Sequence, residues 1–514
     1  MNIEQYYTYK DKFGRDISII ETMRKIKFIL SKYKKELILK FLNHLLKKFA
    51  DGNTIENIDK IQIELINLSI DKYKIIHERA YFVLFQFFYE IENYNEEDSS
   101  IIINQIDVLN LFLLVNHLLD KNEYKSIELD NAEIPIELLM ASFKMSTDFI
   151  DPKDIRIQND LFIKFYEMIY TYNESKNYDK ILIDKTGLSL KEFIEILHKF
   201  KNLEKQAFKN LFKKLEKSSA LKYEKTHETW INRSPMLRIP FDYRFLEQYP
   251  LIKKEDDYYI TSFSLLMRSI IMKPYHILSE ETKNQRPSFR YFFTKNIAEP
   301  TIRKLILEIF QCPKIKEINV CSENNEYADF GILIEESIFL FEIKSVFMGL
   351  EIRYTDDKDK FKMEFEKRYI LNDSGKHQQI NQILKIENEF DKFIDLTGLD
   401  KNLKYKIFCI ELVFDEVLKS IGFNPFNIYI RDKFNKEIKM DIDKFKNINP
   451  YHLNILITFN EMMFLNELLK DPYKKFLVLK NFFSYDETSL EGLVYDLRDG
   501  KVLIEGIDKD DFQS

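Results

Sequence analysis

The stretch EYADFGILIEESIFLFEIKSV, residues 326–346, constrains the fold more than any other part of the chain. Two apolar runs rich in Ile and Phe meet at a short acidic turn, which predicts a β-hairpin. Asp329 interrupts the first run, and Glu342 and Lys344 interrupt the second. Burying three charged side chains in such a hairpin costs free energy unless they are paired or bound. The hairpin is therefore the first candidate site.

Two registers of this hairpin are open, and both gather the three charges. A turn at residues 335–336 places Asp329 opposite Glu342, whereas a turn at 336–337 places it opposite Lys344. Cross-strand partners share a face, and so do residues two apart in one strand. In either register the charges form one cluster. The other face of the hairpin is apolar and carries Phe330, Ile332, Ile334, Phe339, Phe341 and Ile343.

The residue types in this cluster suit phosphodiester hydrolysis. Two carboxylates a few ångströms apart resist ionising together unless a cation lies between them. Oxygen ligands are those that Mg²⁺ and Mn²⁺ prefer, and such a metal can activate water and stabilise charge on a phosphate. A lysine beside the metal can help to neutralise the transition state.

The alternative interpretation is a salt-bridged trio on a partly exposed sheet face. Glu-x-Lys is a frequent tripeptide, and it also occurs at Glu123, Glu174, Glu281 and Glu437, in polar or helical surroundings. The run SIFLFEIKSV is instead typical of a strand buried on both faces. This apolar setting favours a functional cluster.

The elements around the hairpin follow the order α-β-β-β-α-β. The expected elements are a helix at 289–310, strands at 314–320, 326–335 and 337–347, a helix at 375–395 and a strand at 405–414. Three further elements are expected: a strand at 452–459, a helix at 460–471 and, because of the Asp-Gly pair, a hairpin at 493–507.

With this order of elements, Asp329 and the Glu342-Ile343-Lys344 tripeptide resemble the PD-(D/E)XK nuclease superfamily. The resemblance covers roughly residues 285 to 415, and it extends to about residue 480 if the strand and helix expected after residue 415 are part of the same core. Ala328 stands where that superfamily usually has a proline. The resemblance implies a restriction-endonuclease-like α/β core. It also implies that Asp329, Glu342 and the Ile343 carbonyl are metal ligands and that Lys344 is the catalytic lysine.

Many members of the superfamily add a glutamate from the preceding helix and a glutamine from the helix after the lysine strand. Glu299 is the candidate for the further metal ligand. The sequence GKHQQINQ offers Gln378, Gln379 and Gln382, of which Gln378 is the favoured catalytic candidate. For each of these residues, a plain surface position is the alternative.

Candidate contacts to nucleic acid lie just before Glu299. Arg286, Arg290 and Lys295 alternate with aromatic side chains, a combination that suits phosphate and base contacts. A second basic set in the expected loop after the Lys344 strand comprises Lys358, Lys360, Lys362, Lys367 and Arg368. Acidic residues at 356, 357 and 359 are mixed into it, which is more typical of a solvated surface.

The first part of the chain has a different character. From about residue 18 to 220 apolar residues recur at helical spacing without a fixed repeat, which predicts an irregular all-α domain. Residues 224–250 hold the single Trp and three prolines and predict an extended linker. The expected domains are 1–222, helical and suited to sensing or partner binding; 223–284, a linker with a small α/β extension; and 285–514, the nuclease-like domain.

The composition excludes several other classes. The net charge of −7 gives no overall positive field, although a local basic groove stays compatible with it. The 8 His residues form no HExxH motif, and there is no P-loop. The 3 cysteines form no CxxC pair, which fits a reducing compartment. The N-terminus lacks the pattern of a signal peptide, and no apolar run approaches the roughly 18 residues of a membrane span. A cytoplasmic protein without membrane contact is expected.

Together these features predict a multidomain α+β protein that acts as a Mg²⁺- or Mn²⁺-dependent deoxyribonuclease. DNA is favoured over RNA as the substrate, and an endonuclease over an exonuclease. A role in bacterial anti-phage defence or restriction, with a homodimer or a protein partner, is expected from the resemblance alone. The alternative is a catalytically silent nuclease fold whose helical domain binds a protein or nucleic-acid partner.

Overall fold

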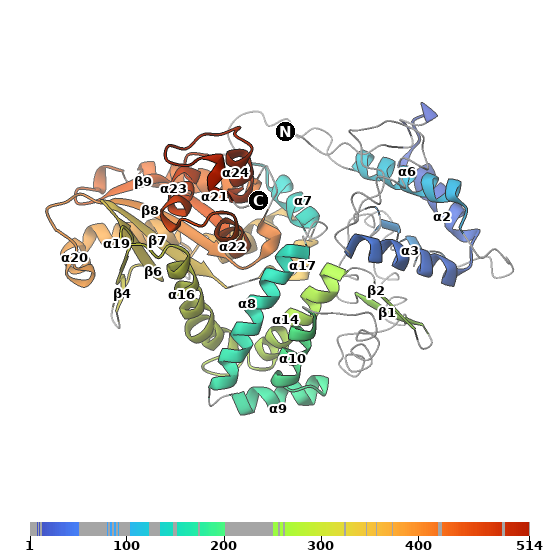
Figure 1. Ribbon diagram of the computed structural model, residues 1–514, viewed down its shortest axis with the longest axis horizontal. Coiled ribbons are helices and arrows are strands. Elements are labelled where there is room, and N and C mark those ends of the chain that lie inside the picture. Colours follow the sequence, from blue (N-terminus) through green and yellow to red (C-terminus); the bar gives the residue numbers. More distant parts are fainter. Residues whose placement is uncertain are drawn as a thin grey trace. The chain divides into compact units, whose positions relative to one another are not determined.

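The chain is a mixed α+β protein that packs as two compact units. A computed structural model describes residues 13–50, 103–122, 134–146, 152–200 and 250–512, apart from short gaps within them, and separate positions at 8, 10 and between 80 and 91. One unit comprises Met1–Glu128 and Asp148–Lys283, and the other comprises Leu129–Thr147 and Asn284–Ser514. The elements of both units are labelled in Figure 1.

Up to residue 200, the described residues of the first unit form helices joined by short connections, with no strand among them. Its helices are α2 (Ile19–Ser31), α3 (Lys35–Ala50), α6 (Gln105–Asn122), α8 (Pro152–Thr171), α9 (Ser175–Thr186), α10 (Leu190–Phe200) and α14 (Phe263–Glu281). A hairpin of β1 (Leu251–Lys254) and β2 (Asp257–Ile260) precedes α14. Ser18 caps α2, and the hydroxyl of Tyr166 on α8 donates to the carbonyl of Ile271 on α14 at 2.6 Å. The expected linker at 224–250 lies outside the described residues, apart from position 250.

The second unit is built on a five-stranded mixed sheet with the order β3-β6-β7-β8-β9. Its strands are β3 (Lys316–Ile318), β6 (Phe330–Ile334), β7 (Ser337–Lys344), β8 (Lys406–Val413) and β9 (Asn449–Thr458). β3, β6 and β7 pair antiparallel, whereas β7, β8 and β9 pair parallel. A small hairpin of β4 (Cys321–Ser322) and β5 (Asn325–Glu326) is inserted before β6.

The central hairpin adopts the first of the two open registers. Phe330 pairs with Phe341 and Ile334 with Ser337, so the turn lies at residues 335–336. Glu335 has a positive φ of 52°, as a tight two-residue hairpin turn requires. Extending this register by one residue places Asp329 opposite Glu342.

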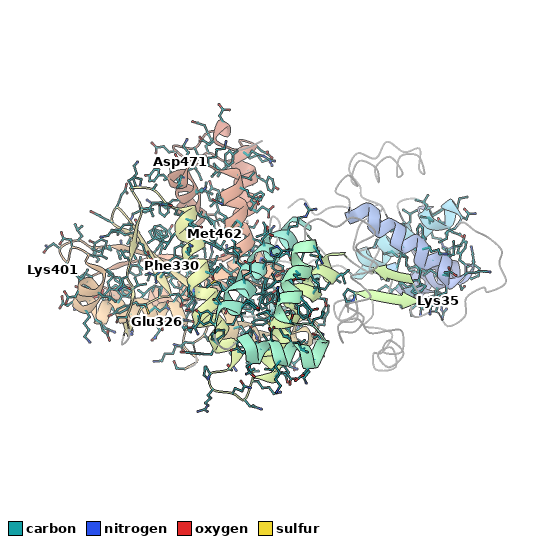
Figure 2. The ribbon with its side chains drawn as sticks, turned by 60° about the horizontal axis from the view of Figure 1, so that its bottom comes forward. Lys35, Glu326, Phe330, Lys401, Met462 and Asp471 are labelled. Atoms are coloured by element: carbon teal, nitrogen blue, oxygen red, sulfur yellow. The ribbon has the colours of Figure 1, made fainter. Side chains whose placement is uncertain are left out.

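Helices cover both faces of the sheet, so β7 is buried along nearly its whole length. The helices in this part of the chain are α15 (Phe289–Phe292), a π-helical turn (Phe293–Ala298), α16 (Glu299–Ile309), α17 (Leu350–Arg353), α18 (Lys358–Tyr369), α19 (Gln378–Asn388), α20 (Phe390–Thr397), α21 (Pro425–Met440), α22 (Phe459–Leu468), α23 (Pro472–Phe482) and α24 (Leu490–Arg498). The face of β7 that carries Glu342 packs Ile338 and Leu340 against isoleucines of α19. On the opposite face Phe339 contacts Phe476 of α23 at 4.7 Å between ring centroids. Figure 2 shows Phe330 and Met462 among the packed side chains and the exposed Lys401 at the periphery.

Helix α7 (Ile136–Ser146) packs with the second unit, although the expected domain 1–222 includes it. The ring of Phe143 lies 5.6, 6.4 and 5.1 Å from those of Phe361, Phe365 and Phe426. These rings belong to one buried apolar cluster formed by α7, α18 and α21. The second unit is therefore assembled from two separate parts of the chain.

Two expectations about local structure were wrong. The basic segment after β7 is the helix α18 rather than a loop, because Phe361, Phe365 and Tyr369 recur at helical spacing and are buried. Residues 490–498 form α24, and residues 499–507 form no strand. Gly500, with a φ of 70°, ends that helix in the left-handed region instead of turning a hairpin. The expected helix at 375–395 exists as the two helices α19 and α20.

No helix in the described part of the chain is long and apolar enough to cross a membrane.

Candidate active site

The candidate site lies where β6 begins, β7 ends and α19 starts. Asp329 directly precedes β6, Glu342 and Lys344 are the last polar residues of β7, and Gln378 is the first residue of α19. Glu299, the first residue of α16, lies close enough for its charge to raise the pKa of Asp329. The sheet register and the two helix N-termini thus bring residues together that are far apart in the sequence.

Asp329 is fixed by the backbone of β7 and is almost completely buried. Its amide donates to the carbonyl of Phe341 at 3.2 Å, and its Oδ2 accepts from the amide of Ile343 at 2.7 Å. Only 6% of its side chain is exposed. Burial, together with the charges of Glu342 and Glu299, raises the pKa of Asp329 well above its ordinary value, although the Ile343 amide and a nearby lysine oppose this.

Glu342 is held by side chains from α19 and by Lys344. Its Oε1 accepts from the Lys344 ammonium at 3.3 Å and from the Gln378 amide, and its Oε2 accepts from the Gln382 amide at 2.8 Å. The Gln378 side-chain oxygen in turn accepts from Lys344. Gln379 faces elsewhere, since its oxygen accepts from buried Asn454. Gln378 and Gln382, four residues apart on one helix face, are therefore the glutamines that reach the cluster.

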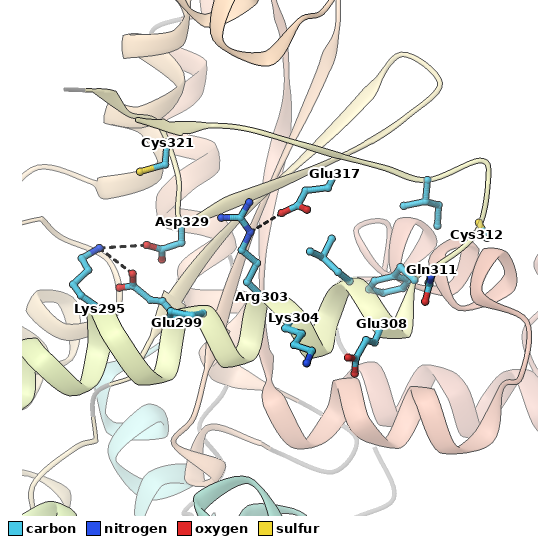
Figure 3. A pocket seen from close by; sticks show the side chains of 14 residues that line it. Lys295, Glu299, Arg303, Lys304, Glu308, Gln311, Cys312, Glu317, Cys321 and Asp329 are labelled. Carbon is cyan, nitrogen blue, oxygen red and sulfur yellow. Dashed lines mark hydrogen bonds and ion pairs between the residues drawn. The ribbon is translucent and has the colours of Figure 1, made fainter. Parts of the chain in front are cut away.

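Lys295 is a further basic residue among the carboxylates, besides Lys344. Its ammonium lies 3.1 Å from Glu299, 3.2 Å from Glu326 and 3.7 Å from Asp329. Figure 3 shows its ammonium joined by dashed lines to both Asp329 and Glu299. Burial alone would lower the pKa of Lys295, but the charges of Asp329, Glu299 and Glu326 outweigh it and raise that pKa. The lysine that the sequence suggested for phosphate contact is thus paired with acids.

A groove of 680 Å³ runs along α16 from this lysine. Lys295, Glu299 and Asp329 lie at one end, and Lys304, Glu308 and Gln311 line it further along, as Figure 3 shows. Within it, Arg303 forms an ion pair with Glu317 at 2.5 Å. Part of the acidic cluster is therefore open to a ligand that enters from this groove.

The other residues considered for nucleic-acid contact lie further out. Arg286 and Arg290 are exposed, just before and within α15. On α18, Arg368 pairs with Glu364 at 3.1 Å, and Lys358 pairs with Glu137 of α7. The paired cations of α18 match a solvated, mixed-charge surface.

Sequence reasoning missed Glu326 beside Lys295, and it also missed a fifth carboxylate, Glu411. It lies beside Glu342 in the parallel pairing of β7 and β8, with none of its surface exposed. Neither of its oxygens has a hydrogen-bond partner among the described residues. Burial raises the pKa of Glu411 to about 8, while Lys344 lowers it and Glu342 raises it further. The signal was present in YKIFCIELVF, where a single acid interrupts an apolar strand as Glu342 does.

His377, next to Gln378, was also overlooked. It is buried against Phe434, with ring centroids 5.5 Å apart, and neither ring nitrogen has a hydrogen-bond partner within the described part of the chain. Burial lowers the pKa of His377 to about 3, and the charges of Lys433 and Lys344 act in the same direction. A neutral imidazole therefore stands at the start of α19.

In the residues that the structure describes, no three His, Cys, Asp or Glu side chains are arranged as a group that could hold a metal ion. The oxygens of Asp329, Glu299 and Glu342 are engaged by lysine and glutamine side chains. Ile343, whose carbonyl is the fourth expected ligand, is a buried residue of β7 between Glu342 and Lys344.

The sequence matches no protein-family model, and neither a curated protein nor a solved structure matches it significantly.

Proposed function

We propose that this protein is a metal-dependent nuclease of the PD-(D/E)XK type that hydrolyses phosphodiester bonds in DNA. The observation that carries the proposal is the convergence of Asp329, Glu342, Lys344 and Gln378 at one point of the sheet. The order of α16, three antiparallel strands, α19 and the parallel strand β8 supports a restriction-endonuclease-like core.

The chemistry of the donor set fits a hard divalent cation. Asp329, Glu342 and Glu299 interact closely enough for their charges to raise the pKa of Asp329, and a cation relieves such repulsion. These three carboxylates and the Ile343 carbonyl are the residues that would hold Mg²⁺ or Mn²⁺. When bound, the cation would supply Lewis-acid stabilisation of the charge that develops on the phosphate.

The chain's own side chains have distinct roles in this proposal. Lys344, with 12% of its side chain exposed, would donate hydrogen bonds to the attacking water or to a phosphate oxygen. Gln378 and Gln382 orient Glu342, and Gln378 also positions Lys344. The exposed Arg286 and Arg290 would contact the phosphate backbone. A defence or restriction role and a homodimeric assembly follow only from the resemblance to the superfamily.

One observation favours a second candidate function, a silent nuclease fold that serves as a scaffold. In the described residues the acids are paired with lysines and glutamines and form no group of three suited to a metal. In this alternative the helical unit binds a protein or nucleic-acid partner, and the carboxylate cluster is structural.

The two functions differ in a cleavage assay with purified full-length protein. We expect nicking of supercoiled plasmid in Mn²⁺ or Mg²⁺, and a closed circular substrate separates endonuclease from exonuclease activity. Lys344→Ala should lower the rate by about a hundredfold or more, because the charge it would stabilise is left uncompensated. Lys304→Ala is the matched control, since Lys304 also lines the groove along α16. Equal cleavage by wild type and Lys344→Ala would show that the activity does not depend on this site. Cleavage of neither DNA nor RNA, together with no metal binding, would favour the scaffold.

A further inference from the structure

The contacts of Lys295 occupy atoms that the proposed metal site needs. Asp329 uses Oδ2 for the amide of Ile343 at 2.7 Å, and its Oδ1 faces the Lys295 ammonium at 3.7 Å. Glu299 likewise directs its Oε2 at this ammonium, at 3.1 Å. A cation that binds Asp329 and Glu299 from the groove therefore meets a positive charge already held there.

The second lysine of the cluster is placed differently. Lys344 donates to Glu342 and Gln378, and 12% of its side chain is exposed. Lys295 is 39% exposed, and it lines the groove along α16. The Lys295 side chain can turn toward solvent when Asp329 and Glu299 bind a cation, whereas the Lys344 side chain is enclosed.

The backbone beneath Lys295 is also unusual. Residues 293–298 form a π-helical turn, in which the amide of Glu299 donates to the carbonyl of Thr294, five residues back. Such turns are rare in proteins, and those that occur often lie at functional sites. Lys295 lies within this turn and Glu299 directly follows it, so one short segment carries a proposed metal ligand and the cation paired with it.

We infer that Lys295 is a built-in counter-ion that competes with the divalent cation for Asp329 and Glu299 and thereby sets the metal affinity of the site. The inference rests on the proposed function, because it takes these two acids as metal ligands. In the metal-free protein the ammonium neutralises the acids, and a dication displaces it. Monovalent or weakly binding ions then do not displace the ammonium, and a divalent cation binds only when its concentration is high enough to compete with it.

Metal binding by calorimetry tests this without any nuclease assay. Wild type, Lys295→Met, Lys295→Arg and Lys304→Met are titrated with Mn²⁺ in the absence of DNA. If the ammonium is paired in more than about nine-tenths of the molecules, Lys295→Met tightens the apparent Kd by about tenfold or more. Lys295→Arg keeps the charge and should stay close to wild type. Lys304→Met removes a lysine from the same groove and controls for net charge.

The outcomes separate the inference from the proposed function. Tighter binding by Lys295→Met alone, or binding by this variant where wild type shows none, supports the counter-ion. Mn²⁺ binding by wild type that Lys295→Met leaves unchanged or weakens overturns the counter-ion and leaves the proposed metal site standing. Absence of binding in every variant overturns both.

A second measurement uses the wild-type protein and does not depend on the variants folding. Labelling of lysines with an amine-reactive reagent, followed by mass spectrometry, should show a severalfold rise at Lys295 when Mn²⁺ is added, with Lys304 unchanged. Unchanged labelling of Lys295 at saturating Mn²⁺ would show that the ammonium is not displaced.

Discussion

The carboxylate of Asp329 accepts a hydrogen bond from the backbone amide of Ile343, with 2.7 Å between oxygen and nitrogen. Because the amide of Asp329 also donates to the carbonyl of Phe341, this residue binds β7 on both sides of Glu342. Asp329 therefore combines a structural task with its proposed chemical one.

Substitutions at Asp329 should separate the two tasks. Asp329→Asn keeps an oxygen acceptor for the Ile343 amide, so its free energy of unfolding should match or exceed that of wild type, while Mn²⁺ binding is lost. Asp329→Ala leaves that amide without its partner and should cost about 1–3 kcal/mol. Urea denaturation and Mn²⁺ titration of both variants are the measurements. Equal destabilisation by Asn and Ala would show that the hydrogen bond contributes nothing.

Gln378 and Gln382 should differ in their effect on activity. Gln378 reaches Glu342 and Lys344, whereas Gln382 reaches the other oxygen of Glu342. Loss of an orienting partner typically lowers activity by about 10–100-fold. The cleavage rate of Gln378→Leu should therefore fall by close to 100-fold, and that of Gln382→Leu by close to tenfold. Adding Gln378→Leu to Lys344→Ala should cost little more, because both act through the same ammonium. Additive losses in cleavage rate would contradict this coupling.

Glu411 predicts a loss of stability as the pH rises from about 4.5 to about 8. A carboxyl group whose pKa rises to about 8 in the folded protein binds its proton more tightly there than in the unfolded chain. Its unfavourable contribution is absent below the unfolded pKa near 4.5 and grows until the pH passes about 8. The stability gain of Glu411→Gln over wild type should therefore increase by up to roughly 5 kcal/mol between pH 4 and pH 9. Denaturation curves of both proteins at pH 4 and pH 9 measure this gain. An equal difference in the free energy of unfolding at the two pH values would refute the prediction.

His377 predicts the opposite response to acid. The folded pKa of about 3 lies below the unfolded value near 6.5, so the unfolded chain takes up the proton first. Stability is lost as the pH falls from about 6.5 toward 3, by about 2 kcal/mol at pH 5. The free energy of unfolding of His377→Leu should be close to that of wild type at pH 8. Between pH 8 and pH 5 it should fall by about 2 kcal/mol less than that of wild type. Parallel losses in the two proteins would show that His377 does not contribute.

Much of the sheet was predictable, because its strands are apolar runs of strand length. The same signal misled at residues 493–507, where the helix α24 begins before the expected hairpin. The register was not predictable, since Glu335, Glu336 and Ser337 can all occupy a tight turn. The pairing of Ile334 with Ser337 fixes it. The helix α18 was missed because lysines and acids surround the three buried rings at 361, 365 and 369.

The cluster itself was predictable only in part. Asp329, Glu342 and Lys344 follow from strand periodicity, because partners in one hairpin are close in the sequence. The positions of Lys295, Glu326 and Glu411 depend on how helices and distant strands pack, which the sequence pattern does not contain. Sequence reasoning consequently gave Lys295 a role in gripping phosphate, and the structure pairs it with acids.

The place of Phe143 in the ring cluster with Phe361, Phe365 and Phe426 has a practical consequence for expression. A gene fragment that begins at residue 285 encodes every side chain of the candidate site, yet it omits the α7 segment. The product would expose an aromatic surface to water and would be prone to aggregate. The smallest autonomous version of this unit is therefore a spliced one, in which residues 129–147 are fused to 284–514 or are supplied as a separate peptide.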